Sequence, residues 1–290
     1  WKPAIYGAWA GRLAKVPARI HALAGMGFVA SSSSFKARLL RQLLSRMLRT
    51  AADAHFIVQN PEDLEMLRRW LKLPRTRLHL IRGSGVDIQK WKPLPEPPEP
   101  PVVFVLPARM LWTKGVGEFV EALRILKRRG LPVEGWLVGG VDEENPSRVP
   151  KRWLEERAEE GIVRWLGHVQ DIRSVWEQAH VAVLPSYREG LPKALLEAAA
   201  CARPLIATDA PGCREVVRNG ETGLLVPARD PEALAEAIAK LAMDKEGRRR
   251  MGACARMLVE QEFSLERVIR ETLALYEHLA SMEGAKHCAC

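Results

Sequence analysis

Three absences limit what this chain of 290 residues can be. It has no run of 18 consecutive apolar residues, so we expect no membrane-spanning helix. Its five cysteines show no paired spacing, which argues against a disulfide framework and favours a reducing compartment. Its first 50 residues contain no Asp or Glu, although nine of them are Lys or Arg. The composition is otherwise globular, with 47% apolar and 27% charged residues, which excludes wholesale disorder.

The excess positive charge is confined to this acid-free segment. The chain carries a net charge of +9, and residues 51–290 hold 35 basic and 35 acidic residues. A localised excess of this kind indicates an anionic partner, either a membrane surface or a nucleic acid. We expect an anionic membrane surface and no nucleic acid, because charge alone points to the latter.

Residues 34–52 have the pattern of a basic amphipathic helix. Their apolar side chains recur at helical spacing, and four Arg lie mostly off that stripe. Such a helix can lie on a membrane surface. It can equally bury the stripe in a domain core and leave the Arg side chains in water, so both interpretations stay open.

A proline-rich segment divides the rest of the chain. Residues 92–101 contain six prolines, which exclude a helix or an interior strand and predict a stiff linker between domains. We expect a small N-terminal domain at 1–91. Apolar strands and amphipathic helices alternate over 102–263, which predicts a parallel, doubly wound sheet. A last helix at 264–281 is expected to pack back towards the N-terminal domain, and 282–290 to form a tail.

The first cluster of candidate site residues follows the predicted strand at 102–106. In a doubly wound sheet, ligands bind at the carboxyl ends of the strands. Arg109 and Lys114 fall between this strand and a predicted helix at 116–128. The helix start supplies free N–H groups and a positive dipole end, so two cations beside it make a site for a diphosphate. The alternative is a pair of solvated loop cations.

The second cluster follows the predicted strand at 181–184. Glu189 comes soon after the strand, Pro192 suits the first turn of a helix, and Glu197 falls in its second turn. A carboxylate there can accept two hydrogen bonds from the vicinal hydroxyls of a ribose.

These motifs resemble those of the family 4 retaining glycosyltransferases of GT-B fold. Residues 189–197 (EGLPKALLE) match the family's E-x7-E motif, Arg109 and Lys114 match its donor-diphosphate pair, and 85–87 (GVD) match its interdomain turn. Further stretches agree in order and spacing, at 138–146, 185–189, 207–212 and 219–227. Residues 25–28 and 31–35 are similar to a stretch of the bacterial subgroup that acts on saccharides linked to polyprenyl diphosphate.

The resemblance implies an α/β protein of GT-B fold, with two Rossmann-like, doubly wound domains. Only about 90 residues precede the linker, whereas a half of this fold needs roughly 150. A glycine-rich first loop is also absent. We therefore expect the N-terminal domain to be incomplete and the chain to be N-terminally truncated. Whether this fragment is active or inactive on its own stays open.

The resemblance also implies a role for each site residue. Glu189 would lie beside the donor sugar, while Arg109 and Lys114 would neutralise the departing diphosphate. Glu197 would hold the ribose hydroxyls. The remaining donor-binding residues implied by the resemblance are Gly190, Leu191, Pro192, His168 and Val169.

No metal and no cofactor are expected, because the family is metal-independent and no Asp-x-Asp motif is present. The tail contains His287, Cys288 and Cys290, which could hold a metal but are interpreted as part of a frayed end.

The resemblance implies transfer of a sugar from a nucleotide-sugar, with UDP as the expected nucleotide, to a lipid-linked saccharide in bacterial polysaccharide or glycan synthesis. The chain is then expected to be cytoplasmic and peripheral on the inner face of the cytoplasmic membrane. Three alternatives stay open. They are a transferase with a soluble acceptor, a sugar-nucleotide epimerase of the same fold, and a catalytically silent nucleotide-sugar-binding protein.

Overall fold

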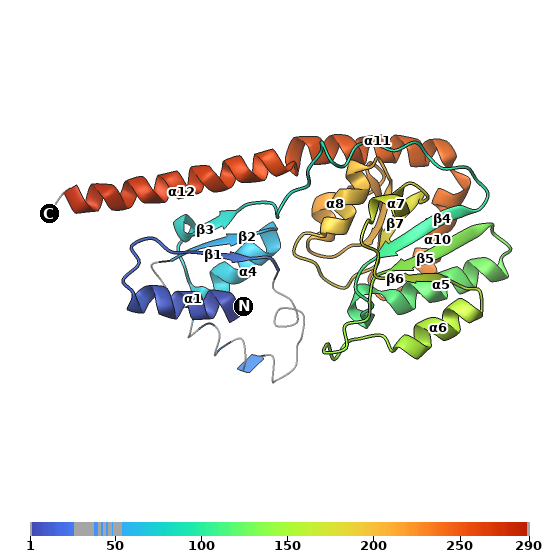
Figure 1. The fold of residues 1–290 in the computed structure, drawn as a ribbon, viewed down its shortest axis with the longest axis horizontal. Coiled ribbons are helices and arrows are strands. Elements are labelled where there is room, and N and C mark those ends of the chain that lie inside the picture. Colours follow the sequence, from blue (N-terminus) through green and yellow to red (C-terminus); the bar gives the residue numbers. More distant parts are fainter. Residues whose placement is uncertain are drawn as a thin grey trace. The chain divides into compact units, whose positions relative to one another are not determined.

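The computed structural model describes residues 2–25, 38, 39, 42, 45, 48 and 54–288. These residues form two compact units (Figure 1). Unit 1 comprises Trp1–Gly85 and Leu265–Cys290, and unit 2 comprises Val86–Ser264. The predicted helix at 34–52 falls mainly outside the described residues, and so does the stretch at 25–35 apart from residue 25.

Unit 2 is built on a six-stranded parallel sheet. Its strands are β4 (Val102–Pro107), β5 (Val133–Val138), β6 (Arg164–Gly167), β7 (Val181–Leu184), β8 (Leu205–Thr208) and β9 (Gly223–Val226). They lie side by side in the order β6-β5-β4-β7-β8-β9. The first strand is therefore central, and the chain winds outward from it in both directions. The strand order reverses between β4 and β7, which is where this type of sheet binds its ligands.

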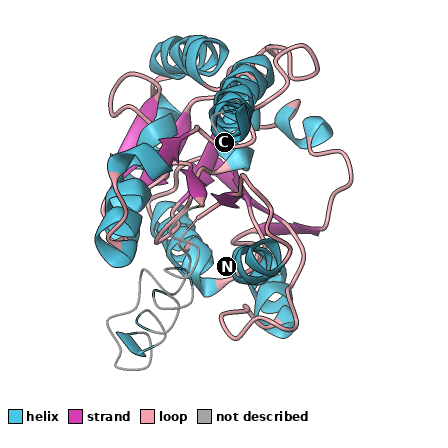
Figure 2. Ribbon diagram, turned by 90° about the vertical axis from the view of Figure 1, so that its left-hand side faces the viewer, coloured by secondary structure: helices cyan, strands magenta, loops and turns pink. Residues whose placement is uncertain are grey.

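Helices cover both faces of this sheet. They are α5 (Val116–Arg128), α6 (Lys151–Glu159), α7 (Arg173–Trp176), α8 (Lys193–Ala200), α9 (Cys213–Val216), α10 (Pro231–Met243) and α11 (Lys245–Glu262). Successive side chains of a strand point to opposite faces. Phe104 accordingly packs in the cluster of α5 and α10, while Val105 packs in the cluster of α8 and α11. The helices are cyan and the strands magenta in Figure 2. These two buried clusters are why the strands read as continuous apolar runs in the sequence.

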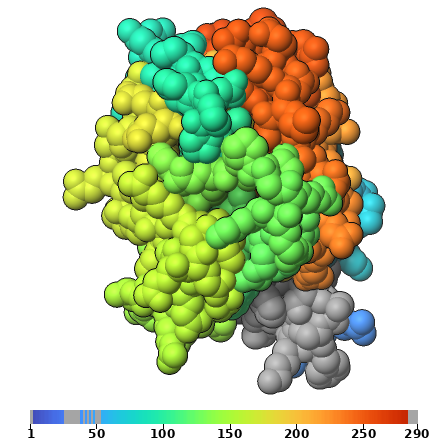
Figure 3. All heavy atoms as spheres, turned by 90° about the vertical axis from the view of Figure 1, so that its right-hand side faces the viewer, coloured from blue at the N-terminus to red at the C-terminus, as the bar shows by residue number. Residues whose placement is uncertain are grey.

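The proline-rich segment belongs to unit 2, and the boundary between the units falls between Gly85 and Val86. This differs from our prediction that 92–101 links the domains. Proline lacks an N–H but keeps its carbonyl as an acceptor. The buried Arg203 donates to the carbonyls of Leu94 (3.3 Å) and Pro95 (2.7 Å), which fastens the segment to the unit. In Figure 3 its turquoise atoms lie beside the orange atoms of α11.

Unit 1 contains a three-stranded parallel sheet in the order β1-β2-β3. Its elements are α1 (Lys2–Leu13), β1 (Ile20–Leu23), β2 (His55–Val58), α4 (Pro61–Leu71), the 3-10 turn η1 (Arg75–Arg77), β3 (Leu78–Leu80) and α12 (Leu265–Cys288). α4 begins with Asn60 as its N-cap, whose side-chain oxygen accepts from the N–H of Asp63 at 2.8 Å.

The last helix packs on the sheet of unit 1. Val268, Leu275 and Leu279 of α12 are buried against Ile57 and Ile81. α12 continues to Cys288, so residues 282–288, which we expected to form a frayed tail, have a helical backbone. Four of its seven residues, Met282, Glu283, Ala285 and Lys286, are of types that favour helix. Among the described residues, no helix is both long enough and apolar enough to cross a membrane.

Candidate functional site

The strand order brings two loops together at the carboxyl ends of β4 and β7. The loop after β4 contains Arg109 and the 3-10 turn η2 (Trp112–Lys114). The loop after β7 spans residues 185–192 and leads into α8. Since β4 and β7 are paired neighbours at the point where the winding reverses, both loops open at one end of the sheet.

An ion pair joins the two loops. Lys114 Nζ donates to Glu189 Oε1 across 75 positions of sequence. The two side chains are only 21% and 13% exposed, so water screens this pair less than one at the surface. The structure thus unites one predicted diphosphate ligand with the predicted sugar-side carboxylate.

Glycine lets the loop after β4 approach the loop after β7. Gly115, the N-cap of α5, has φ +75°, and a Cβ there would lie 2.2 Å from the carbonyl oxygen of Pro185. Beside it, the N–H of Tyr187 donates to the carbonyl of Thr113 at 3.0 Å. Lys114 therefore lies between two residues that touch the opposite loop.

A second glycine supports Glu189 from the side of β8. Gly212 has φ +79°, and a Cβ there would lie 2.6 Å from the carbonyl oxygen of Glu189 and 2.5 Å from that of Gly190. The N–H of Glu189 donates to the carbonyl of Pro211 at 3.2 Å. Close backbone contacts therefore hold the candidate catalytic carboxylate from two neighbouring loops.

Arg109 is more exposed and is held differently. Its guanidinium donates to Asp142 Oδ2 at 2.6 Å, and 63% of its side chain is exposed. Asp142 follows β5 and was not among the predicted site residues. Its only sequence signal is its place in the stretch at 138–146, which agrees with the family pattern.

Glu197 lies in the second turn of α8, as predicted. Its side chain is 13% exposed, and Lys193 Nζ lies 3.6 Å from its Oε1. Burial raises the pKa of Glu197, and the charges of Lys193 and Lys90 oppose that rise. Pro192 is the N-cap of α8 with an extended backbone, so the helix starts one residue later than expected. Gly190 and Leu191 lie just before this cap.

The two residues predicted to face the base also lie at the carboxyl end of the sheet, but after its outermost strand on one side. His168 and Val169 follow β6, the edge strand, two strands away from β4. His168 is exposed, whereas Val169 is partly buried against the apolar cluster on the α8 side. Gly140, after β5, lies beside His168, since a Cβ there would be 3.8 Å from the Cβ of His168.

Two further residues at this edge were missed by sequence reasoning. Tyr187 donates from its hydroxyl to Glu118 Oε1 at 2.5 Å, and Glu118 lies in the first turn of α5. Cys213 is buried behind Glu189, and burial together with the charge of Glu189 raises the pKa of its thiol to about 12. This thiol is therefore not a nucleophile at neutral pH.

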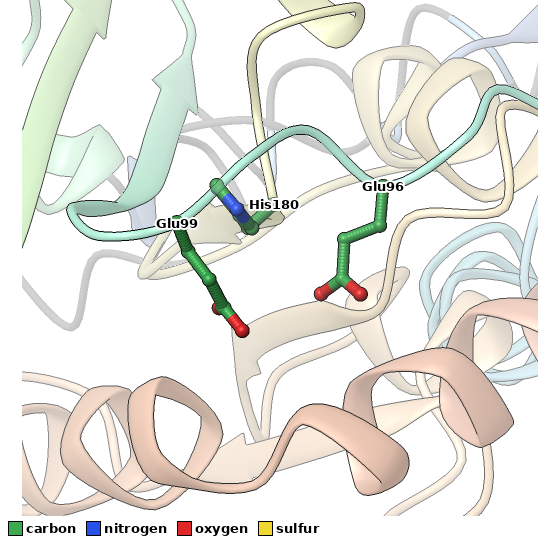
Figure 4. A group of neighbouring side chains, drawn as sticks. All are labelled: Glu96, Glu99 and His180. Atoms are coloured by element: carbon green, nitrogen blue, oxygen red, sulfur yellow. The ribbon is translucent and has the colours of Figure 1, made fainter.

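Glu96 and Glu99, both in the proline-rich segment, meet His180 at a different place (Figure 4). Their side chains converge as metal ligands do, but their partners do not fit a metal. The buried Arg248 donates to both carboxylates, at 2.7 Å for Glu96. His180 Nδ1 accepts from the N–H of Val103 at 3.0 Å, which leaves the proton of the neutral ring on Nε2.

Two more cations complete this group, because Arg249 lies 3.2 Å from Glu96 and Lys245 lies 2.9 Å from Glu99. Three cations thus face two carboxylates, and a divalent cation would add charge to an already positive group. We interpret the group as an ion-paired anchor for the proline-rich segment.

Comparison with known proteins points in one direction. The sequence profile of the family described as "Glycosyl transferases group 1" matches residues 100–244. The chain is 33% identical over 256 residues to N,N'-diacetylbacillosaminyl-diphospho-undecaprenol alpha-1,3-N-acetylgalactosaminyltransferase of Campylobacter jejuni, covering 83% of this chain and 65% of the relative. It is 32% identical to alpha-maltose-1-phosphate synthase of Mycolicibacterium smegmatis, covering 80% and 64%. The chain thus spans slightly less than two thirds of the length of either relative.

Solved structures share the fold. Anabaena HepE in complex with UDP superposes with a TM-score of 0.79 at 20% identity, covering 97% of this chain and 76% of that one. Sucrose-phosphate synthase of Thermosynechococcus elongatus gives 0.78 at 26% identity, covering 95% and 72%.

Proposed function

Because this chain belongs to the group 1 glycosyl transferases, whose profile matches half of it, we propose that it transfers a sugar from a nucleotide-sugar to a lipid-linked saccharide. The α/β GT-B fold expected from the sequence is confirmed by the structural neighbours. One observation carries the proposed activity. It is the pairing of Lys114 with Glu189 at the switch point of the sheet, where a cation and a carboxylate meet.

The chemistry of glycosyl transfer explains why both charges are needed. The transition state separates a positively charged sugar from an anionic diphosphate, and fixed cations stabilise the departing anion. Lys114 and Arg109 supply these cations from one loop. Glu189 positions the donor sugar beside them, with retention of configuration, while the N–H groups of Gly190 and Leu191 face donor oxygens at the start of α8.

The nucleoside lies along the same sheet edge in this proposal. Glu197 accepts hydrogen bonds from the two ribose hydroxyls. His168 and Val169 face the base. UDP is the proposed nucleotide, and the fold shared with a UDP-bound protein supports this choice.

The acceptor is proposed from the relatives. The Campylobacter jejuni protein is named for transfer to a sugar on diphospho-undecaprenol. We propose a lipid-linked saccharide for this chain as well, with transfer at the cytoplasmic face of the membrane and the chain bound there peripherally. Unit 1 supports this because α1 and the turn after it expose Tyr6, Trp9, Leu13 and Val16 near Arg12 and Lys15. Aromatic and basic side chains are those that membrane interfaces favour.

The reaction is proposed to need no metal and no cofactor. In this proposal Lys114 and Arg109 supply the positive charge that a metal would otherwise bring to the leaving group. Transfer in the presence of EDTA should therefore equal transfer in added Mg²⁺, and a requirement for Mg²⁺ would overturn this part of the proposal.

A calorimetric titration with UDP tests the donor site. We expect saturable binding that Glu197→Gln weakens by about 10- to 150-fold, because a bond to an ionised carboxylate contributes about 1.5–3 kcal/mol. Absence of UDP binding by the folded wild-type chain would contradict the proposed donor.

The matched control is Glu155→Gln. Glu155 pairs with Lys151 at i,i+4 and 3.5 Å, as Glu197 pairs with Lys193 at 3.6 Å, but it lies on α6. We expect this change to leave UDP affinity unaltered. Incubation of a UDP-sugar with and without a polyprenyl-diphosphate-linked saccharide then separates a transferase from an epimerase, because only the epimerase forms product without an acceptor.

A further inference from the structure

We propose that Tyr187 is a positioning residue, which sets the distance between Lys114 and Glu189 by tying the start of α5 to the loop after β7. The inference rests on the proposed function, because it concerns where these two groups stand relative to a bound nucleoside diphosphate. The contacts of Tyr187 go instead to Thr113, Glu118 and Arg229. It acts through the backbone on either side of them.

The backbone of Tyr187 makes the first tie. Its N–H donates to the carbonyl of Thr113 at 3.0 Å, and Ser186 Oγ donates to the same carbonyl at 3.3 Å. Thr113 directly precedes Lys114, and Tyr187 lies two residues before Glu189. These hydrogen bonds therefore join the two loops one residue before Lys114 and two residues before Glu189.

The side chain of Tyr187 makes the second tie. Its hydroxyl donates to Glu118 Oε1 at 2.5 Å, four residues after Lys114 and inside the first turn of α5. The loop after β7 thus makes hydrogen bonds to the chain on both sides of Lys114, at Thr113 and at Glu118. A cation held from both sides keeps one position, which is what fixed electrostatic stabilisation of a leaving group requires.

The surroundings keep the hydroxyl in its donor form. Burial and the bond to Glu118 raise the pKa of Tyr187 to about 12, against the opposing effect of Arg229. The guanidinium of Arg229, from the loop after β9, lies 4.5 Å from the ring centroid. A cation over the ring face is a further contact that restrains the tyrosine.

The test measures the contribution of the terminal phosphate of the ligand. Calorimetry with UMP and with UDP gives the ratio of the two dissociation constants, which reports the contact of Lys114 with the second phosphate. The ratio is the dissociation constant of UMP divided by that of UDP, so it is large when the second phosphate adds affinity. In Tyr187→Phe we expect this ratio to fall about 3- to 10-fold, the range for one hydrogen bond. The affinity for UMP should stay within about twofold, because UMP lacks the second phosphate.

Variants of Glu118 separate positioning from general damage. Glu118→Ala should lower the ratio as Tyr187→Phe does, and the double variant should lower it no further, because both remove one bond. Glu118→Gln keeps an acceptor oxygen and should preserve the ratio. The matched control is Tyr276→Phe, which removes a hydroxyl from an exposed tyrosine of α12. If Tyr187→Phe does not fold, the two Glu118 variants carry the test.

Three results would overturn the inference. One is an unchanged ratio in folded Tyr187→Phe and Glu118→Ala. Another is a double variant whose loss is the sum of the single losses. The third is a wild-type chain that binds no UDP, which overturns the proposed donor together with this inference. Failure of the inference alone is recognised by normal UDP binding in the wild type with no change in the ratio.

Discussion

Units 1 and 2 differ most in what they leave exposed. Of the eleven large apolar side chains that are exposed within the described residues, nine belong to unit 1 and two, Met243 and Met257, to unit 2. Unit 2 covers both faces of a six-stranded sheet with its own helices, whereas the sheet of unit 1 has three strands.

This difference matches a division of tasks. The candidate donor site is built entirely from unit 2, where ion pairs and close backbone contacts hold each charged group. Unit 1 instead presents apolar and aromatic side chains near cations, as surfaces that bind other molecules do.

The largest effect should come from removing the anchor of the proline-rich segment. Arg248→Ala leaves the carboxylates of Glu96 and Glu99 short of their buried partner, and breaking such a pair costs about 3–5 kcal/mol. Hydrogen exchange read by mass spectrometry should show faster exchange in unit 2 peptides and unchanged exchange in α1 and α4. Arg250→Ala, an exposed change on the same helix, is the control. Equal acceleration in both units would show that they unfold together.

The next effect concerns the close approach of two loops. Gly115→Ala puts a Cβ 2.2 Å from a carbonyl oxygen at φ +75°, so we expect a loss of about 2–4 kcal/mol and of UDP binding. Gly130 has φ +70° with open space around it, so Gly130→Ala should cost only about 1–2 kcal/mol and leave UDP binding intact. Urea unfolding and calorimetry measure both. Equal costs for the two changes would show that strain alone matters at Gly115.

A smaller effect is expected from the charge on Glu197. Burial raises its pKa in the folded chain, so the stability it contributes is present below the unfolded pKa and is lost as pH rises through the folded pKa. Glu197→Gln removes that loss. The thermal midpoint of the variant should exceed that of the wild type by roughly 1–3 °C at pH 7 and match it in acid. A lower midpoint at pH 7 would mean that the Lys193 pair outweighs burial.

The smallest effect is expected for the surface of unit 1. Trp9→Ser removes one of four exposed apolar side chains along α1 and the following turn, so binding to anionic vesicles at low salt should weaken about two- to fivefold. Co-sedimentation measures this, and Met257→Ser, an exposed apolar residue of unit 2, is the control. If both variants bind equally, the contrast between the units does not concern membranes.

The sequence was sufficient where one pattern determines structure. The apolar runs at 102–106 and 181–184 predicted buried strands, and the structure has strands at Val102–Pro107 and Val181–Leu184 whose two faces are both covered. Glu197 was predicted in the second turn of its helix because Pro192 indicated where the helix starts. These are local signals, and they also carried the family resemblance.

Contacts that depend on strand order could not be foreseen in this way. Lys114 and Glu189 are brought together because β7 pairs with β4, and nothing in either segment shows that pairing. The segment with Glu96 and Glu99 has the sequence pattern of a linker, and their partner Arg248 lies about 150 residues later, where no local signal connects the two. The hydroxyl bond from Tyr187 to Glu118 has the same long-range origin.

The two ends of unit 2 lie next to each other. The N–H of Val86 donates to the carbonyl of Phe263 at 2.9 Å, and Val86 also pairs with Ser264. The chain therefore enters and leaves unit 2 at neighbouring positions. Cutting the chain at these two positions removes no strand of the six-stranded sheet and no helix that covers it. Residues 86–264 should accordingly be producible as an isolated domain, on which crystal soaking and solution NMR can test the proposed donor site without the rest of the chain.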